Sequence, residues 1–259
     1  MIIQTPAKIN LFLRVTGTLP GGFHSIETLF VPVPEFSDKL EITTVPDGKQ
    51  NISVRCDLAA VPAGKDNICA AAAQKVLNVM QISDSVEIFI EKKIPLSGGM
   101  GGGSSDAAAV ILALQKKYGD LPDHGKQIAL ECGSDVPFFL NPVASIGKGR
   151  GEILTPAENL SIPEIKIIPM NFPTSAKWAY QNLQPETEHD PRTLNDMLSV
   201  LRDGNFSAAA KLMRNDLAPA VFRKFPILEL SRRDFEEKNP GWKVQLSGSG
   251  STLFAIRYL

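Results

Sequence analysis

The chain has few of the residues that build metal centres or disulfide frameworks. Its 259 residues include three cysteines and three histidines. Cys56, Cys69 and Cys132 lie far apart and form no CxxC pair, so we expect reduced thiols rather than disulfides. The histidines show no HExxH or other paired spacing, which argues against a zinc site.

Neither sign of charge is in excess. Lysine and arginine total 27, aspartate and glutamate total 28, and the formal charge is −1. A broad nucleic-acid surface normally leaves a basic excess, so we expect no nucleic-acid partner. A local basic pocket for a phosphate is still compatible with this balance.

Long hydrophobic runs are also missing, since none reaches the length that spans a membrane. The first apolar run, "MIIQTPAKINLFLRV", contains Lys8, Asn10 and Arg14, so we do not expect a signal peptide. We therefore expect a cytoplasmic protein with no membrane partner. Its length and its 43% hydrophobic content suffice for two modest domains or one large one.

The order of predicted elements indicates an α+β fold, because strands and helices alternate without a regular βαβ rhythm. Strands are predicted around the break "LPGG", and the turn "PDGKQ" predicts a hairpin over residues 40–56. Asp66 or Asn67 could cap a helix over residues 66–80. Further segments follow as a strand at 86–94, helices at 124–133, 194–201 and 206–213, a strand at 163–170, and two strands around a Gly/Ser turn at 242–259.

The stretch "IPLSGGMGGGSSDAA" (94–108) contains a glycine loop between a predicted strand and a predicted helix. Behind it, Ala107, Val110, Ile111 and Leu114 recur at the spacing of a buried helix stripe. Backbone N–H groups at a helix start attract anions, and glycines let a phosphate approach them. Ser104, Ser105 and Asp106 offer oxygens that could cap the helix.

Two common phosphate-binding motifs do not fit this loop. No lysine follows the glycines as a Walker A motif requires, and GxGxxG fails in every register. A flexible surface connector is the alternative interpretation. The position between a strand and a capped helix favours a phosphate cradle.

Three further stretches, "PAKINLFL" (6–13), "GSDVPFFL" (133–140) and "SGSGSTLFA" (247–255), join the glycine loop in a recognisable order. Together they resemble the GHMP kinase superfamily, and within it the branch that acts on a cytidine-diphosphate-linked polyol. The resemblance runs nearly end to end. It implies a two-lobed fold, with a ribosomal-protein-S5-like lobe at 1–150 that binds ATP and a ferredoxin-like lobe at 151–259 that completes the substrate cleft. The stretch "GKGRGE" (147–152) is interpreted as the junction.

The resemblance implies that ATP is the co-substrate and that Mg²⁺ accompanies it. Asp135 would be the general base that accepts the proton of the substrate hydroxyl, and Lys8 would lie beside it. A structural ion pair is the alternative for these two residues. The implied ATP-binding set is Pro95, Leu96, Ser97, Gly98, Gly99, Met100, Gly101, Gly102, Gly103, Ser104 and Ser105, with Asn67 near the adenine or simply capping a helix. Asp106 or Ser105 could hold Mg²⁺, but capping of the helix is the ordinary interpretation of two such neighbours, so the metal ligands are left unassigned.

Substrate recognition is implied for five residues. Phe23 would stack on the cytosine, His24 would contact its edge, and Asn10 would lie near the reacting hydroxyl. Thr174 and Trp178 would complete the wall, with Tyr180 as an alternative to Trp178. Packing in the core is the alternative for the two aromatic rings, and a structural hydrogen-bonded role is the alternative for His24.

The chain departs from the family at the turn before His24. An arginine-rich turn ending in Asp-Gly-Tyr-His is usual, whereas this chain has "TLPGGFH". Phe23 keeps an aromatic face but lacks the phenol hydroxyl. Two other functions stay open: a sister kinase acting on homoserine or mevalonate, and a member that binds ligand without turnover. We expect a monomer or a weak homodimer.

Overall fold

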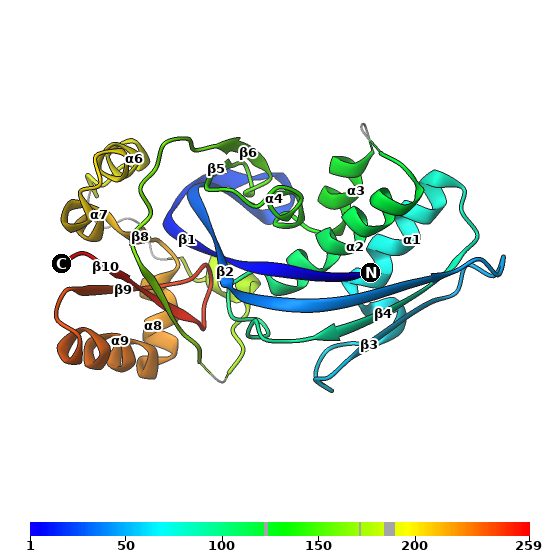
Figure 1. Ribbon diagram of the computed structural model, residues 1–259. Helices are drawn as coiled ribbons and strands as arrows, with labels where there is room; N and C mark the ends of the chain where they lie inside the picture. Colours follow the sequence, from blue (N-terminus) through cyan, green and yellow to red (C-terminus); the bar gives the residue numbers. More distant parts are fainter. Residues whose placement is uncertain (122–123, 171, 184–189) are drawn as a thin grey trace. The chain divides into compact units, whose positions relative to one another are not determined.

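The structure is a computed structural model that describes residues 1–121, 124–170, 172–183 and 190–259 (Figure 1). The chain divides into two compact units. Unit 1 comprises Met1–Ala7, Val33–Leu96 and Gly101–Pro142, and unit 2 comprises Lys8–Pro32, Ser97–Met100 and Val143–Leu259. Neither unit is a continuous stretch, so these units differ from a division at residue 150. The division into lobes at that residue stays a prediction.

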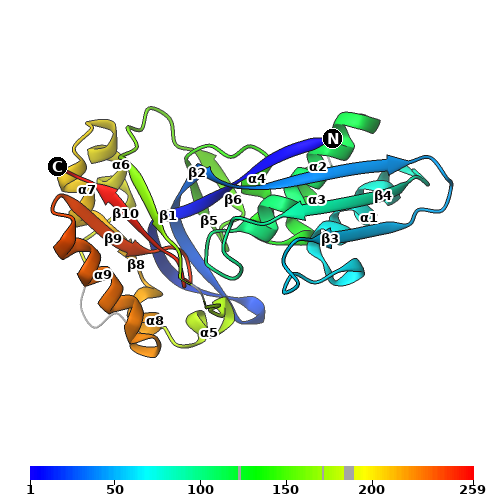
Figure 2. The same cartoon turned by 60° about the horizontal axis from the view of Figure 1, so that its bottom comes forward.

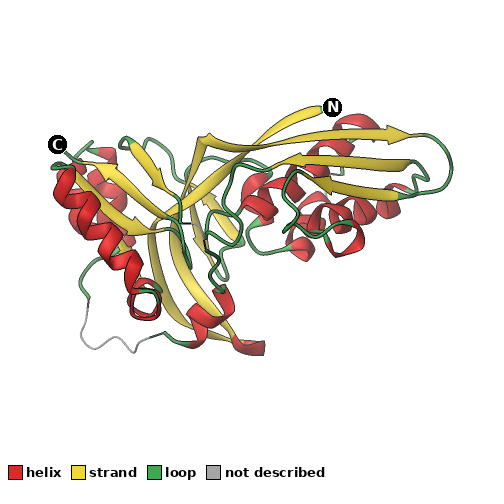
Figure 3. Ribbon diagram, turned by 90° about the horizontal axis from the view of Figure 1, so that it is seen from below, coloured by secondary structure: helices red, strands yellow, loops and turns green. Residues whose placement is uncertain are grey.

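Unit 1 is a sheet with helices on one face. Its strands lie in the order β3 (Ile52–Cys56), β4 (Ser85–Glu91) and the C-terminal half of β2 (Phe23–Val45). Its helices are η2 (Gly64–Asp66), α1 (Ile68–Met80), α2 (Gly102–Tyr118), α3 (Gly125–Cys132) and α4 (Val136–Phe139). Figure 1 shows α1, α2 and α3 over one face of the strands, and Figure 3, seen from below, shows the strands in front of them.

The predicted hairpin over residues 40–56 is wrong. β4 lies between β2 and β3, antiparallel to β2 and parallel to β3, so Ile88 pairs with Ile42 on one side and Val54 on the other. Two parallel strands need a crossover connection, and α1 supplies it. The turn residues were interpreted correctly as a chain reversal, but β4 takes the central position because its apolar residues are buried.

The predicted helices of unit 1 are confirmed. Asn67 caps α1, and its Oδ1 accepts a hydrogen bond of 2.8 Å from the N–H of Cys69. On α2, the stripe predicted from spacing is fully buried at Ala107, Val110, Ile111 and Leu114. The helix that follows the glycine loop, α2, is therefore held in unit 1 by its buried apolar face.

Three charged side chains are buried together in unit 1. Lys92 donates to Asp38 and, at 2.8 Å, to Oδ2 of Asp106, while the side chains are only 3%, 0% and 4% exposed respectively. Burial first, and then the neighbouring Asp38, raise the pKa of Asp106 to about 7, although Lys92 opposes the shift. Oδ1 of Asp106 accepts no hydrogen bond from any described residue. We call these residues the buried triad.

Unit 2 contains a three-stranded antiparallel sheet in the order β7 (Ile165–Ile168), β10 (Leu253–Arg257) and β9 (Trp242–Leu246). It also contains most of β1 (Ile2–Leu19), the start of β2 and the short helix η1 (Pro20–Gly22) between them. The other elements of unit 2 are β5 (Ser145–Lys148), β6 (Ile153–Pro156), α5 (Ala176–Gln181), α6 (Leu194–Arg202), α7 (Phe206–Leu212), β8 (Arg214–Asn215), α8 (Ala218–Lys224) and α9 (Pro226–Lys238).

The pair α6–α7 and the final pair of strands confirm the predictions for these segments. The stretch 147–152 has another role than a junction, because β5 and β6 pair antiparallel and residues 149–152 form the turn between them inside unit 2. β5 also pairs with β2, where Thr28 lies opposite Gly147. A Cβ at Gly147 would lie 2.6 Å from the ring of Phe30, so glycine is required there for close strand packing.

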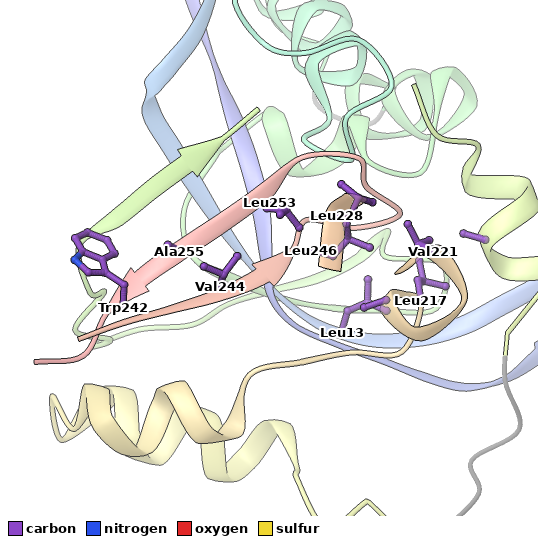
Figure 4. Packing of buried hydrophobic residues seen from close by; sticks show 11 residues of the cluster. Leu13, Leu217, Val221, Leu228, Trp242, Val244, Leu246, Leu253 and Ala255 are labelled. Carbon is purple, nitrogen blue, oxygen red and sulfur yellow. The ribbon is translucent and has the colours of Figure 1, made fainter. Parts of the chain in front are cut away.

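The core of unit 2 lies between the three-stranded sheet and the helices α8 and α9 (Figure 2). Buried residues of β9 and β10 contact Leu217, which directly precedes α8, Val221 of α8 and Leu228 of α9 (Figure 4). Leu13 of β1 joins the same cluster. Among the described residues, no helix combines the length and apolar character needed to cross a membrane.

Ion pairs stabilise the exposed side of α9. Arg232 donates to both carboxylate oxygens of Glu229 at 2.8 Å, and Arg233 donates to the same carboxylate at 2.7 Å. The hydrogen bonds from Arg232 are the largest cause of a pKa of about 2 for Glu229. Glu236 contacts Arg232 and accepts the N–H of Val244 at 2.9 Å, which connects α9 to β9.

Lys92→Met should lower the free energy of unfolding by about 3–5 kcal/mol, because it leaves Asp38 and Asp106 buried without their cation. Asp106→Asn should cost about 1 kcal/mol or less, since Asn can still accept from Lys92 and the Lys92–Asp38 pair stays neutral. Urea unfolding of the two variants measures the difference. Equal losses would contradict the assignment of Lys92 as the centre of the triad.

Glu229→Gln should flatten the acid branch of the stability profile. The pKa of Glu229 is lowered from 4.5 to about 2, so its contribution is present above pH 4.5 and is lost as the pH falls through about 2. The wild type should therefore lose on the order of 1 kcal/mol more than the variant over this window, after allowance for solvent screening. Urea unfolding across the window tests this, with Glu237→Gln, an exposed residue of the same helix, as the control.

Candidate active site

Two glycine-rich segments, far apart in the sequence, lie against each other in unit 2. The Ser247 hydroxyl donates to the carbonyl of Gly99 at 3.0 Å, and the N–H of Thr252 donates to the carbonyl of Gly98 at 3.2 Å. Gly99 has a φ of 76°, and a Cβ there would lie 2.0 Å from the carbonyl oxygen of Ser247. Glycine at position 99 is therefore required by the close approach of the backbones as well as by φ.

Asn215 of β8 fixes the second of these segments. Its side-chain N–H groups donate at 2.8 Å to the carbonyls of Leu246 and Gly248, and its Oδ1 accepts the N–H of Leu217 at 3.0 Å. Because β8 pairs with β1 through Asn215 and Leu13, the turn after β9 is connected to the strand that carries Lys8 and Asn10. Sequence reasoning recognised the motif but missed Asn215, which has no distinctive pattern around it.

The first turn of α2 differs from the prediction. Gly101 is its N-cap with a φ of 74°, and no side chain caps the helix, so the predicted capping by Ser104, Ser105 or Asp106 is wrong. Ser105 is buried, and its hydroxyl donates to the carbonyl of Pro6 at 2.7 Å while its N–H bonds to Gly101. The first N–H groups of a helix have no intrahelical acceptor, so those of Gly102, Gly103 and Ser104 point outward from the start of α2.

Lys8 and Asn10 lie together on β1 in unit 2. The Lys8 ammonium donates to Oδ1 of Asn10 at 2.8 Å and lies 5.1 Å from the centroid of the Phe30 ring. Asn10 donates in turn to the hydroxyl of Thr28 at 2.8 Å. These contacts hold a 4% exposed lysine in one position. Asp135, half-buried directly before α4, belongs to unit 1, so its pairing with Lys8 stays a prediction.

The predicted substrate residues of unit 2 make separate sets of contacts. Thr174 lies by the glycine loop, where its N–H and hydroxyl both donate to the carbonyl of Ser97 at 3.3 Å. The aromatic residues form pairs elsewhere. The rings of His24 and Tyr180 stack with centroids 5.2 Å apart, whereas Trp178 lies under the ammonium of Lys224 at 3.8 Å. Trp178 and Tyr180 were the two alternatives for the wall of the substrate site, and it is Tyr180 that stacks on His24.

Two other predicted residues have structural roles. Both ends of the Asn67 amide are used, since Oδ1 caps α1 and Nδ2 donates to the carbonyl of Pro62 at 2.8 Å. Asp106 belongs to the buried triad. The residues that the structure describes include no group of three or more histidine, cysteine or acidic side chains arranged to hold a metal ion.

Comparison with known proteins now identifies the family. Residues 67–141 match the family described as GHMP kinases N terminal domain. Over 258 residues the chain is 34% identical to the 4-diphosphocytidyl-2-C-methyl-D-erythritol kinase of Chloroherpeton thalassium, covering 98% of this chain and 88% of that protein. The resemblance found in the sequence is confirmed over nearly its full length.

Solved structures agree with this result. A crystal structure of 4-(cytidine 5'-diphospho)-2C-methyl-D-erythritol kinase matches with a TM-score of 0.80 and 31% identity, covering 99% of this chain and 90% of that one. The homoserine kinase of Cytophaga hutchinsonii matches with a TM-score of 0.68 and 18% identity, covering 99% of this chain and 85% of that one, which shows a common fold alone. The predicted α+β GHMP kinase fold is confirmed. The chain therefore belongs to the 4-diphosphocytidyl-2-C-methyl-D-erythritol kinase family of GHMP kinases.

Proposed function

We propose that the chain transfers the γ-phosphate of ATP to the 2-hydroxyl of 4-diphosphocytidyl-2-C-methyl-D-erythritol, a step of the non-mevalonate route to isoprenoid precursors. Membership of the family makes it an ATP-dependent phosphotransferase. The observation that carries the choice of substrate is the 34% identity, along 98% of the chain, to a kinase named for that substrate.

In this proposal Asp135 accepts the proton of the substrate hydroxyl as its oxygen attacks the γ-phosphorus of ATP. An O–P bond forms to the substrate, and the bond from the γ-phosphorus to the bridging oxygen breaks to release ADP. Lys8 reduces the negative charge around the reacting oxygens. Its fixed position beside Asn10 supports this role, because phosphoryl transfer depends mainly on positioning and on charge stabilisation.

We propose that the phosphates of ATP bind along residues 95–104. Support comes from the uncapped first turn of α2 and from the left-handed Gly101 before it, since free N–H groups at a helix start bind anions. Ser105 contributes least to this set, because its N–H and hydroxyl already donate to protein carbonyls. Asn67 supports the edge of the site through α1 rather than through a contact of its amide.

Mg²⁺ would enter with ATP, since it retains waters and phosphate oxygens with one or two protein ligands. It would neutralise the charge of the phosphates. Asp106 does not fit as its ligand, because Lys92 already contacts that carboxylate in a buried position. The nearby Ser104 hydroxyl at the start of α2 is a better candidate. We further propose a cytoplasmic monomer or weak homodimer.

ADP release from ATP and Mg²⁺ tests the reaction, with 4-diphosphocytidyl-2-C-methyl-D-erythritol, homoserine and mevalonate in parallel. We expect turnover with the cytidyl substrate alone. Turnover with another alcohol would keep the kinase and reject the substrate. Binding of ATP without turnover on any of the three would favour the binding-only alternative.

Asp135→Asn, added to the same assay, should fold normally and lose turnover by at least about 100-fold, the usual contribution of a general base. A variant with most of its activity would reject the role of Asp135 as the base.

Gly99→Ala should raise the KM for ATP several-fold and lower stability by about 1–3 kcal/mol, because its Cβ would overlap the Ser247 carbonyl at a φ of 76°. Gly103→Ala is the matched control for folding, since a Cβ there meets nothing nearer than Ile68 at 3.7 Å. Thermal unfolding and steady-state kinetics of both variants separate the two positions. Equal destabilisation by both would contradict the required close approach at Gly99.

A further inference from the structure

The turn between β5 and β6 brings an arginine to the aromatic residue at which this chain departs from its family. The guanidinium carbon of Arg150 lies over the ring of Phe23, 4.7 Å from the centroid, and both residues belong to unit 2. Phe23 is 51% exposed. One face of an exposed aromatic ring is therefore covered by a cation.

The turn holds Arg150 by backbone and carboxylate contacts. Glu152 accepts the N–H of Arg150 at 2.5 Å, and its other oxygen lies 3.8 Å from Nε of the same side chain. Gly149 adopts a φ of 67°, and a Cβ there would lie 2.9 Å from the Glu152 carboxylate. Glycine thus lets the carboxylate fold back over the turn.

The same turn is joined to the strand that begins at Phe23. The carbonyl of Gly149 accepts the N–H of Ile26 at 2.7 Å, and the strand pairing continues from Thr28 and Gly147. Arg150 and Phe23 therefore project from two backbones that are hydrogen-bonded to each other. Their contact follows from the sheet rather than from two independent surface side chains.

A phenylalanine ring at a surface lacks the hydroxyl by which a tyrosine can be held in place. A guanidinium over the ring supplies another constraint, because the planar cation is attracted to the aromatic face. A side chain already held in its bound orientation loses less entropy when a ligand stacks on it. Arg150 covers one face of the ring, and the 51% exposure of Phe23 leaves surface on which a ligand can stack.

We propose that Arg150 is a positioning residue for substrate, which holds the ring of Phe23 so that the opposite face stacks on the pyrimidine of a cytidine-containing alcohol. The inference rests on the proposed function. Lys148, in the same hairpin, offers a matched control. Its side chain is 63% exposed and lies 3.9 Å from Glu27.

Steady-state kinetics of Arg150→Ala test the proposal. We expect the KM for 4-diphosphocytidyl-2-C-methyl-D-erythritol to rise about 2- to 5-fold, the range of a cation–π contact at an exposed site, with kcat and the KM for ATP unchanged. Arg150→Lys should recover part of the loss, because it keeps a cation, whereas Lys148→Ala should change nothing. Arg150→Met keeps the side-chain length without the charge and serves if the alanine variant does not fold.

A double-mutant cycle separates positioning from direct contact with substrate. Phe23→Leu should raise the KM for the cytidyl substrate by itself, and adding Arg150→Ala should then have no further effect. An equal effect of Arg150→Ala in both backgrounds would overturn the positioning role, as would an unchanged KM in the wild-type background. Absence of wild-type turnover on this substrate would overturn the proposed function and the inference together, whereas wild-type turnover with no effect of Arg150→Ala would overturn the inference alone.

Discussion

The approach of two backbones at Gly99 and Ser247 is the constraint on which the rest of unit 2 depends. No side chain fits between them, since a Cβ at Gly99 would lie 2.0 Å from the Ser247 carbonyl oxygen. Thr174 adds hydrogen bonds to Ser97, and Asn215 holds the facing turn by two carbonyls. These glycines lose more conformational entropy on folding than other residues would. The network of hydrogen bonds that fixes the loop offsets this loss.

The two buried lysines show how the same side chain is used in two ways. Lys92 lies between Asp38 and Asp106, and although burial alone would lower its pKa, the two carboxylates raise it. A lysine so paired is a structural element of unit 1. Lys8 instead donates to the neutral amide of Asn10 and lies near an aromatic ring. These contacts hold its ammonium in one position, which suits a residue proposed to act on negatively charged oxygens.

Local patterns in the sequence predicted local structure well. The buried stripe of α2, the cap at Asn67 and the strands around residues 247–252 follow from spacing and capping chemistry, which act within a few residues. The helix α9 was not predicted, because Leu228 is its one fully buried residue. The rest of its apolar side, such as Phe235, is only partly buried and gives a weak periodic pattern in the sequence. The prediction of a hairpin at residues 40–56 was wrong because the pairing is not local. The strand β4, some forty residues further along the chain, lies beside β2 in place of β3.

The sequence motifs of the candidate site could be recognised, but the contacts between its side chains could not. The glycine loop, Lys8 and His24 were recognised from ordered motifs, but the pairing of His24 with Tyr180 depends on how α5 packs in unit 2. Arg150 was not recognised, because its stretch was interpreted as a junction.

The spacing between Gly99 and its partner Ser247 is 148 residues, which affects how the chain folds during synthesis. As the chain leaves the ribosome, the loop emerges long before the turn that fixes it, so the segment proposed to bind phosphate acquires its final shape only after Ser247 has been made.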